Sequence, residues 1–231
     1  AMDHAGELAP LGDDDYAPSF RDWMRGGRAR SRELLPRVHQ VPLLAPEACA
    51  RLLREVDRRQ AAGGRGAPPP NSMHDHAVDL RALGFGALLD SLHARLAPLA
   101  GELLPEFAAR GLDAHHSYLV DYSKEGDEDL GFHVDDAEAT INICLGGDFR
   151  GAELVMMGLR CDLHRQTPVR PEEEVEIEHA AGVAIVHAGR HRHRVERIRS
   201  GRRRNLIVWS RSSASRAGPR TLECAPWCAW S

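Results

Sequence analysis

Two histidines and one aspartate in this chain have the residue types and spacing of a metal site. His133 and Asp135 are separated by one residue, so on a β-strand their side chains point to the same face. A second histidine further along the chain, His193, could then complete one face of an octahedral metal. Two imidazoles and one carboxylate form the facial triad of non-haem Fe(II) oxygenases, which leaves coordination positions open. The sequence therefore predicts a ferrous centre of the oxygenase type.

Three histidines of one segment compete for the second imidazole position, namely His187, His191 and His193. Only His193 is followed ten residues later by a cation, Arg203, whereas the same offset from His191 ends at Gly201. We therefore assign His193 to the metal and interpret the other two as structural histidines or as residues behind the ligands. The remaining histidines are assigned to the surface or to hydrogen-bonded core positions: His74, His76, His115, His116, His164 and His179.

Arg203 is predicted to be a buried cation inside a barrel. We expect Gly201 to form a turn between a strand that carries His193 and a returning strand that carries Arg203. An unpaired buried charge is very costly, so this arginine requires an anionic partner. A planar guanidinium suits a carboxylate, with two parallel hydrogen bonds. The carboxylate that fits this position is that of 2-oxoglutarate.

Charge, apolar runs and cysteine content indicate which binding partners and which cellular compartment to expect. The 231 residues carry a formal net charge of −4 and a sequence pI of about 6.4, so no overall basic field indicates nucleic acid. No apolar run approaches the roughly 18 residues of a membrane span, and no secretory signal pattern is visible. Five cysteines at irregular spacing fit a reducing compartment with free thiols. We expect a cytoplasmic protein without membrane or nucleic-acid partners.

Cys224 and Cys228 near the end of the chain could form half of a zinc site. We find no second pair at usable spacing. The sequence therefore favours free thiols in a partly packed C-terminal tail.

The order of expected elements indicates a mainly β fold with flanking helices, a jelly roll in one domain. Residues 1–36 are expected to form a loosely ordered arm whose Phe20, Trp23 and Met24 dock on the body, and residues 215–231 a tail. A helix is expected from Pro46, and a second one over 85–109, interrupted at Pro98 and Pro105. Alternating or β-branched patterns predict strands at 37–44, 115–122, 140–145, 151–157, 182–187 and 205–209. Short strands between glycine-rich turns, after two helices, favour a jelly roll with a helical N-terminal buttress.

The motifs at 129–146 and 190–193 resemble the 2-oxoglutarate- and iron-dependent oxygenases of the prolyl/lysyl-hydroxylase type. The chain is similar in particular to the "2-oxoglutarate and iron-dependent oxygenase domain-containing" group, and 70–73, 201–213 and the late cysteines extend the resemblance over roughly residues 37–228. It implies a double-stranded β-helix over residues 37–214 that holds Fe(II) through His133, Asp135 and His193. It also implies that Arg203 grips the distal carboxylate of the co-substrate.

The same resemblance implies the activity and three further pocket residues. A member of this family hydroxylates an unactivated C–H bond, consumes O₂ and 2-oxoglutarate, and releases succinate and CO₂, with ascorbate as a candidate reductant. Tyr122, Thr140 and Asn142 match positions beside the co-substrate, although core packing or hydrogen bonding within the sheet would explain them equally well. The sequence departs from the family pattern at Arg197, where proline is common, and at Ala152, where glycine is common.

The sequence motifs do not identify the substrate. The nucleic-acid demethylase branch usually carries a second arginine six residues after the first, and Trp209 stands there instead. A protein or peptide side chain is the favoured target, with 61–76, 158–170 and the N-terminal arm as walls of the substrate site. The alternatives are the same chemistry on a free small molecule, or a non-catalytic, cupin-like metal binder.

Overall fold

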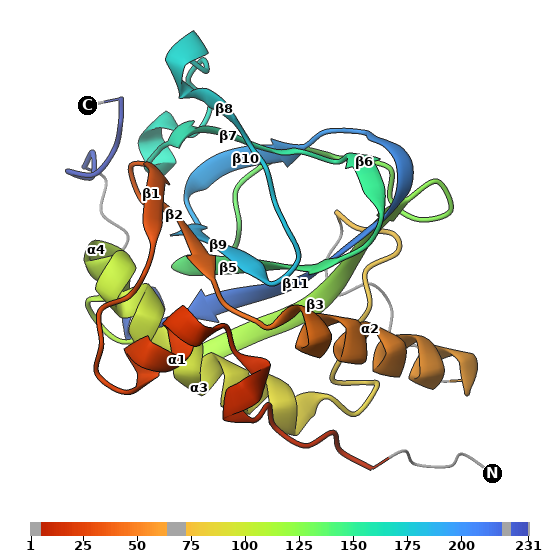
Figure 1. Cartoon of the computed structure of the whole chain (residues 1–231). Coiled ribbons are helices and arrows are strands. Elements are labelled where there is room, and N and C mark those ends of the chain that lie inside the picture. Colours follow the sequence, from red (N-terminus) through yellow and green to blue (C-terminus); the bar gives the residue numbers. More distant parts are fainter. Residues whose placement is uncertain (1–5, 64–72, 219–222, 231) are drawn as a thin grey trace.

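Two antiparallel sheets face each other in the computed structural model, which describes residues 6–63, 73–218 and 223–230 (Figure 1). The larger sheet runs in spatial order β1 (Arg32–Leu35), β2 (Val38–Pro42), β9 (Val183–Ala188), β5 (Ala139–Gly146), β11 (Ile198–Arg211) and β3 (Ala114–Ser123), with β6 (Phe149–Gly151) paired to β11. The smaller sheet is β4 (Leu130–His133), β10 (His191–Val195), β7 (Leu154–Leu159) and β8 (Glu174–Ile177). The predicted jelly roll, a double-stranded β-helix, is confirmed.

Strand alternation gives the larger sheet two different faces. Along β11, Arg203, Asn205 and Ile207 point in one direction, and Leu206 and Val208 point in the other. The first set faces the smaller sheet and the second faces the helices, as their separate core clusters show. The face inside the barrel is therefore the one that carries polar groups.

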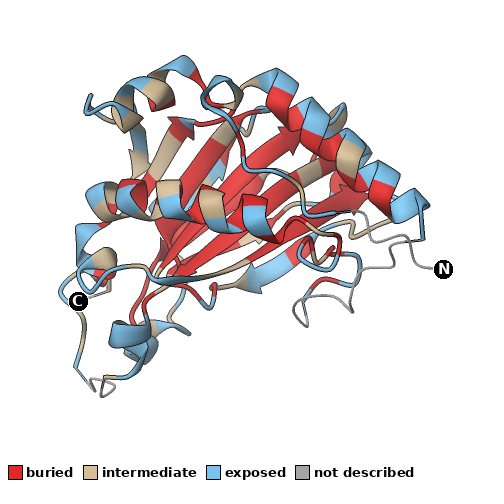
Figure 2. Ribbon diagram, turned by 90° about the horizontal axis from the view of Figure 1, so that it is seen from below, coloured by how far each residue is buried: buried red, intermediate tan, exposed pale blue. Residues whose placement is uncertain are grey.

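The helices cover the outer face of the larger sheet, and their exposed sides face away from its buried strands (Figures 1 and 2). They are α1 (Pro18–Met24), α2 (Pro46–Ala61), α3 (Gly86–Leu103) and the short α4 (Pro105–Ala108) that follows it. The other short elements are α5 (Ser213–Arg216) after β11 and the 3₁₀ turns η1 (Asp13–Asp15), η2 (Asp162–His164) and η3 (Pro171–Glu173), of which η3 contacts β7 of the smaller sheet. Within the described ranges, none of these helices is long and apolar enough to cross a bilayer.

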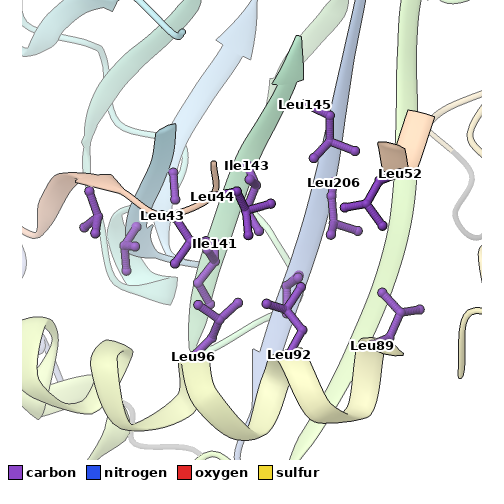
Figure 3. Packing of buried hydrophobic residues seen from close by; sticks show 14 of the residues in the cluster. Leu43, Leu44, Leu52, Leu89, Leu92, Leu96, Ile141, Ile143, Leu145 and Leu206 are labelled. Atoms are coloured by element: carbon purple, nitrogen blue, oxygen red, sulfur yellow. The ribbon is translucent and has the colours of Figure 1, made fainter. Parts of the chain in front are cut away.

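Leucine and isoleucine side chains fill the layer between helices and sheet. Leu92 and Leu96 of α3 and Leu52 of α2 meet Ile141 and Ile143 of β5 in one cluster (Figure 3). Full burial of each such side chain contributes about 1.5–3 kcal/mol relative to its exposed state. This layer anchors β5 and β11 from outside, so their inner faces are free to carry polar side chains.

Three expectations about local structure need correction. The described part of the N-terminal arm is packed rather than loose, because α1 buries Phe20, and Trp23 and Met24 pack beside it as expected. Pro98 does not interrupt α3. It removes one hydrogen bond, and the buried leucines around it hold the helix in place; the break falls at Pro105 instead.

Gly201 is not the turn that the sequence suggested. It lies inside β11 with φ of 77°, and a Cβ there would come within 1.8 Å of the Asp148 carbonyl oxygen. The strand reversal occurs earlier, between Val195 and Ile198. Glycine is required at position 201 by left-handed backbone and by the close approach of β6.

Buried His93 makes folding stability sensitive to acid. Burial, together with neighbouring His115, lowers its pKa from 6.5 to about 4. A depressed histidine pKa means that stability is complete above pH 6.5 and is lost as the pH falls towards 4. We expect this residue to cost up to about 3 kcal/mol of the free energy of unfolding across that window. Urea denaturation of His93→Leu should show a smaller loss between neutral pH and pH 4 than the parent chain; equal losses would contradict the assignment.

Candidate metal centre

The predicted triad residues come together at the junction of β4 and β10. His133 ends β4 and lies directly opposite His193 in the antiparallel pair, with ring centroids 4.1 Å apart. Asp135 is not on the same strand as His133, contrary to the sequence expectation. It follows β4 in a loop, where its N–H donates to the Gly189 carbonyl at 2.9 Å. Gly189 permits this approach, because a Cβ there would lie 2.0 Å from the Ala137 carbonyl oxygen.

The ligand atoms of the triad face one another. Asp135 Oδ1 lies 3.5 Å from His133 Nε2 and 3.7 Å from His193 Nε2. His133 Nδ1 donates to the Gly131 carbonyl at 2.7 Å, and His193 Nδ1 donates to the His191 carbonyl at 2.9 Å. These two bonds fix the tautomer that leaves each Nε2 lone pair directed at the aspartate, which is how metal-ligating histidines are usually held.

The pKa values of the same groups favour the protonation states that bind a cation. Burial opposes ionisation of Asp135, but nearby His193 and His133 outweigh it and hold the pKa of the carboxyl well below its ordinary range. Burial, together with His133, lowers the pKa of His193 well below 6.5. A carboxylate and a neutral imidazole are the protonation states that a metal requires. The donor set therefore fits Fe(II), which would be held by His133, Asp135 and His193.

Two further side chains support Asp135. Thr140 Oγ1 donates to Asp135 Oδ2 at 2.6 Å, and His187 Nε2 lies 3.9 Å from the same oxygen. His187 Nδ1 donates to the Ala188 carbonyl at 2.9 Å. Thr140 thus contacts a metal ligand directly, and His187 takes the position behind the ligands that was one of its two expected roles.

A narrow cavity of about 20 Å³ lies inside the barrel at this centre. Its lining includes His74, Tyr118, Tyr122, Leu130, His133, Asp135, Thr140, Asn142, His187 and His193. The volume is about that of one water molecule. It accommodates a metal ion, whereas an organic co-substrate requires the lining side chains to move apart.

Arg203 is almost fully buried, as expected. Its guanidinium donates to the Ala152 carbonyl, to His179 Nδ1 at 2.8 Å and to Asn205 Oδ1 at 3.2 Å. None of these partners among the described residues is a carboxylate. Ala152 has a φ of 55°, a left-handed backbone conformation that favours glycine. With His179 and Phe149, Arg203 lines a second cavity of about 270 Å³.

Tyr122 and Asn142 both line the metal cavity, and both lie on strands that pair with β11, the strand of Arg203. Tyr122 is directly opposite Arg203 in the β3–β11 pair and lines the metal cavity, and burial raises the pKa of its hydroxyl well above the ordinary value. Asn142 Oδ1 accepts from Asn205 Nδ2 at 2.5 Å, and Asn205 in turn accepts from Arg203. Asn142 therefore helps to hold the arginine.

Two histidines that the sequence assigned to generic positions belong to this region. His179 accepts from Arg203, so its Nε2 donates to the Val183 carbonyl at 2.9 Å, and burial beside the arginine lowers its pKa to about 3. His74 is buried in the lining of the metal cavity. Neither has a spacing relation to the triad in the sequence, so no local pattern could have identified it.

Comparisons with known proteins agree with this geometry. No protein-family model matches the chain. It is 38% identical over 221 residues to 2-oxoglutarate and iron-dependent oxygenase domain-containing protein ICU11 of Arabidopsis thaliana, covering 91% of this chain and 56% of that protein. It is 37% identical over 183 residues to 2-oxoglutarate and iron-dependent oxygenase domain-containing protein 2 of Mus musculus, covering 78% and 50%. The chain thus spans about half the length of the curated relatives it matches.

Solved structures share the fold at low sequence identity. EvdO2 from Micromonospora carbonacea var. aurantiaca, complexed with 2-oxoglutarate, has a TM-score of 0.53 and 17% identity, covering 97% of this chain and 100% of that one. A Trichoplax adhaerens prolyl hydroxylase, in complex with a hypoxia inducible factor oxygen degradation domain peptide fragment, has a TM-score of 0.56 and 11% identity, covering 80% and 88%. The double-stranded β-helix is thus the shared fold. The chain belongs to the 2-oxoglutarate- and Fe(II)-dependent oxygenases, within the oxygenase domain-containing group of its curated relatives.

Removal of the Thr140 hydroxyl should weaken metal binding. Thr140→Val keeps the shape but leaves Asp135 Oδ2 without its donor at 2.6 Å, and loss of such a supporting bond typically costs 10- to 100-fold in affinity. Anaerobic Fe(II) titration by calorimetry should show this loss, whereas Thr140→Ser, which keeps the hydroxyl, should bind like the parent. Unchanged affinity in Thr140→Val would mean that the bond does not position Asp135.

Proposed function

We propose that this domain hydroxylates an unactivated C–H bond of a protein or peptide side chain. The observation that carries the proposal is the combination of the triad with Arg203, a buried cation whose hydrogen-bond partners among the described residues are all uncharged. Such a cation is stabilised by a carboxylate from outside the chain. The binding of 2-oxoglutarate supplies it.

The residues of the site fall into two groups, one that holds the iron and one that binds 2-oxoglutarate. His133, Asp135 and His193 hold the iron, and Thr140 keeps the aspartate oriented. Arg203 binds the distal carboxylate of 2-oxoglutarate, with Asn205 and His179 fixing the guanidinium. Together the iron and 2-oxoglutarate supply the oxidising chemistry, which consumes O₂ and releases succinate and CO₂. The protein excludes bulk water and aims the target carbon.

Apolar side chains beside the centre support a peptide target. Phe132 and Met73 are exposed large hydrophobic residues, and each precedes a histidine that lines the metal cavity. Contiguous exposed apolar patches mark surfaces that bind another macromolecule, and we infer that these two side chains contribute to such a surface. The alternative target, a free small molecule, makes less use of these groups outside the cavity.

Substitution of Arg203 should raise the 2-oxoglutarate requirement. Removal of one partner of a buried charge pair costs about 2 kcal/mol or more, so Arg203→Ala should raise the KM for 2-oxoglutarate about 30-fold or more. Arg204→Ala is the matched control, because Arg204 points to the opposite face and pairs with Asp57 at 2.5 Å. An unchanged KM in Arg203→Ala would show that another group binds the co-substrate.

Succinate release distinguishes an oxygenase from a metal-binding protein without catalysis. With Fe(II), 2-oxoglutarate and O₂, the parent chain should release succinate, and His193→Ala and Asp135→Ala should lose both bound iron and succinate release. Mass spectrometry of a treated lysate should then show a gain of one oxygen on peptides. A gain confined to small molecules would move the substrate to the alternative class, and no succinate from iron-loaded parent protein would refute catalysis.

A further inference from the structure

A second cluster of metal-ligating side chains joins two segments that are far apart in the sequence. Cys161 and His164 belong to the turn η2 after β7, and Cys224 and Cys228 belong to the C-terminal segment. Their ligand atoms all lie within 4.8 Å of one another. The C-terminal segment lies on the side of the barrel where β7 ends, because the Ala229 N–H donates to the Leu159 carbonyl at 3.1 Å (Figure 1).

The distances in this cluster match tetrahedral coordination. His164 Nδ1 lies 3.5 Å from each of the sulfur atoms of Cys161, Cys224 and Cys228. The Sγ atoms of Cys161 and Cys224 are 4.0 Å apart. Around a zinc ion with Zn–S of about 2.3 Å and Zn–N of about 2.0–2.1 Å, tetrahedral angles place sulfur and nitrogen about 3.6 Å apart and two sulfurs about 3.8 Å apart.

Hydrogen bonding and disulfide formation do not account for this arrangement. An imidazole Nδ1 carries either one proton or one lone pair, so it bonds to one thiol and not to three at equal distance. The Sγ separation of Cys161 and Cys224 is about twice the length of a disulfide bond. A shared central cation explains the equal distances.

Backbone N–H groups contact the sulfur atoms of this cluster. The Cys161 N–H donates to Cys228 Sγ at 3.4 Å. The backbone N–H groups of Ala225 and His164 also donate to the Cys161 sulfur. Such N–H donors favour the deprotonated sulfur that metals bind.

A buried arginine provides the remaining charge balance. Three thiolates, one neutral imidazole and Zn²⁺ carry a net charge of −1. Arg192 is fully buried and close enough to Cys228 to interact with it electrostatically, and its Nη2 has no hydrogen-bond partner within the described ranges. The acidic group near Arg192 is Glu173, at 3.7 Å, and Glu173 is already held by Arg160 through two bonds at 2.6 and 2.7 Å. An anionic centre beside Arg192 therefore offsets a cation that is otherwise incompletely paired.

We propose that Cys161, His164, Cys224 and Cys228 form a structural zinc site. Soft thiolate ligands in a closed tetrahedral set select zinc, whereas the His-Asp-His triad selects Fe(II) and keeps positions open. The site ties the C-terminal segment to the loop after β7, one of the predicted walls of the substrate site. The sequence expectation of free thiols is thereby revised. It overlooked Cys161-x-x-His164, a mixed pair distant from the late cysteines.

Metal analysis of paired variants tests the site independently of catalysis. The parent chain, purified without chelator, should contain about one zinc per chain by plasma mass spectrometry. Cys224→Ser and His164→Ala should lose zinc while the iron triad still loads with Fe(II), and His133→Ala should lose iron while zinc remains. Cys49→Ala is the matched control, because Cys49 lies on the buried face of α2, outside the cluster; it should keep both metals.

Cobalt substitution of the parent chain keeps the test decisive if the cysteine variants do not fold. Co(II) in the site should give thiolate-to-cobalt charge-transfer absorption and the intense visible bands of tetrahedral coordination. These bands should persist in His133→Ala, which separates this site from the iron centre. The proposal is overturned if the parent, loaded with zinc or cobalt, shows neither stoichiometric zinc nor thiolate–cobalt absorption.

Discussion

The carboxylate of Asp135 is the buried charge on which the centre depends. It receives a hydroxyl hydrogen bond from Thr140, and its two oxygens face the Nε2 atoms of three imidazoles. The Nδ1–H groups of His133 and His193 donate hydrogen bonds to backbone carbonyls. The Nε2 lone pair of each ring is therefore directed at Asp135. A buried carboxylate and imidazole lone pairs converge on one position, and a metal cation there balances the negative charge. The same electrostatic requirement thus explains both the arrangement of these side chains and their preference for a metal.

The pairing register of β11 fixes which of its side chains face the barrel interior next to this centre. Its outer residues pack under the helices. Its inner residues Arg203 and Asn205 are linked by hydrogen bonds to each other and to Asn142 of β5. Hydrophobic anchoring on one face thus fixes the direction of a polar network on the other. Strand pairing also places Tyr122 of β3 directly opposite Arg203.

The sequence was sufficient for the parts of the molecule that depend on local patterns. The jelly roll follows from strand alternation, and His133, Asp135 and His193 follow from residue type and offset. Burial of Arg203 was also anticipated. The role of Thr140 was assigned to the co-substrate pocket, and only the folded geometry shows its bond to Asp135.

Features created by long-range contacts escaped prediction. Pro98 continues a helix because buried leucines outweigh one missing hydrogen bond, and Gly201 serves a close approach to β6 rather than a turn. His179 acquires its role by packing against Arg203. The cysteine cluster needs the turn after β7 and the C-terminal segment at once, and no window of sequence contains both.

Strand β10 has a particular consequence for evolution of the domain. Its consecutive residues Arg192 and His193 point in opposite directions, one towards the cysteine cluster and the other into the triad. An insertion or deletion of a single residue here would exchange these two environments, placing a guanidinium among the iron ligands. A one-residue length change in this strand therefore keeps both environments only where a β-bulge absorbs it, and the irregular pairing of β10 with β4 and β7 shows that this strand already contains such irregularities.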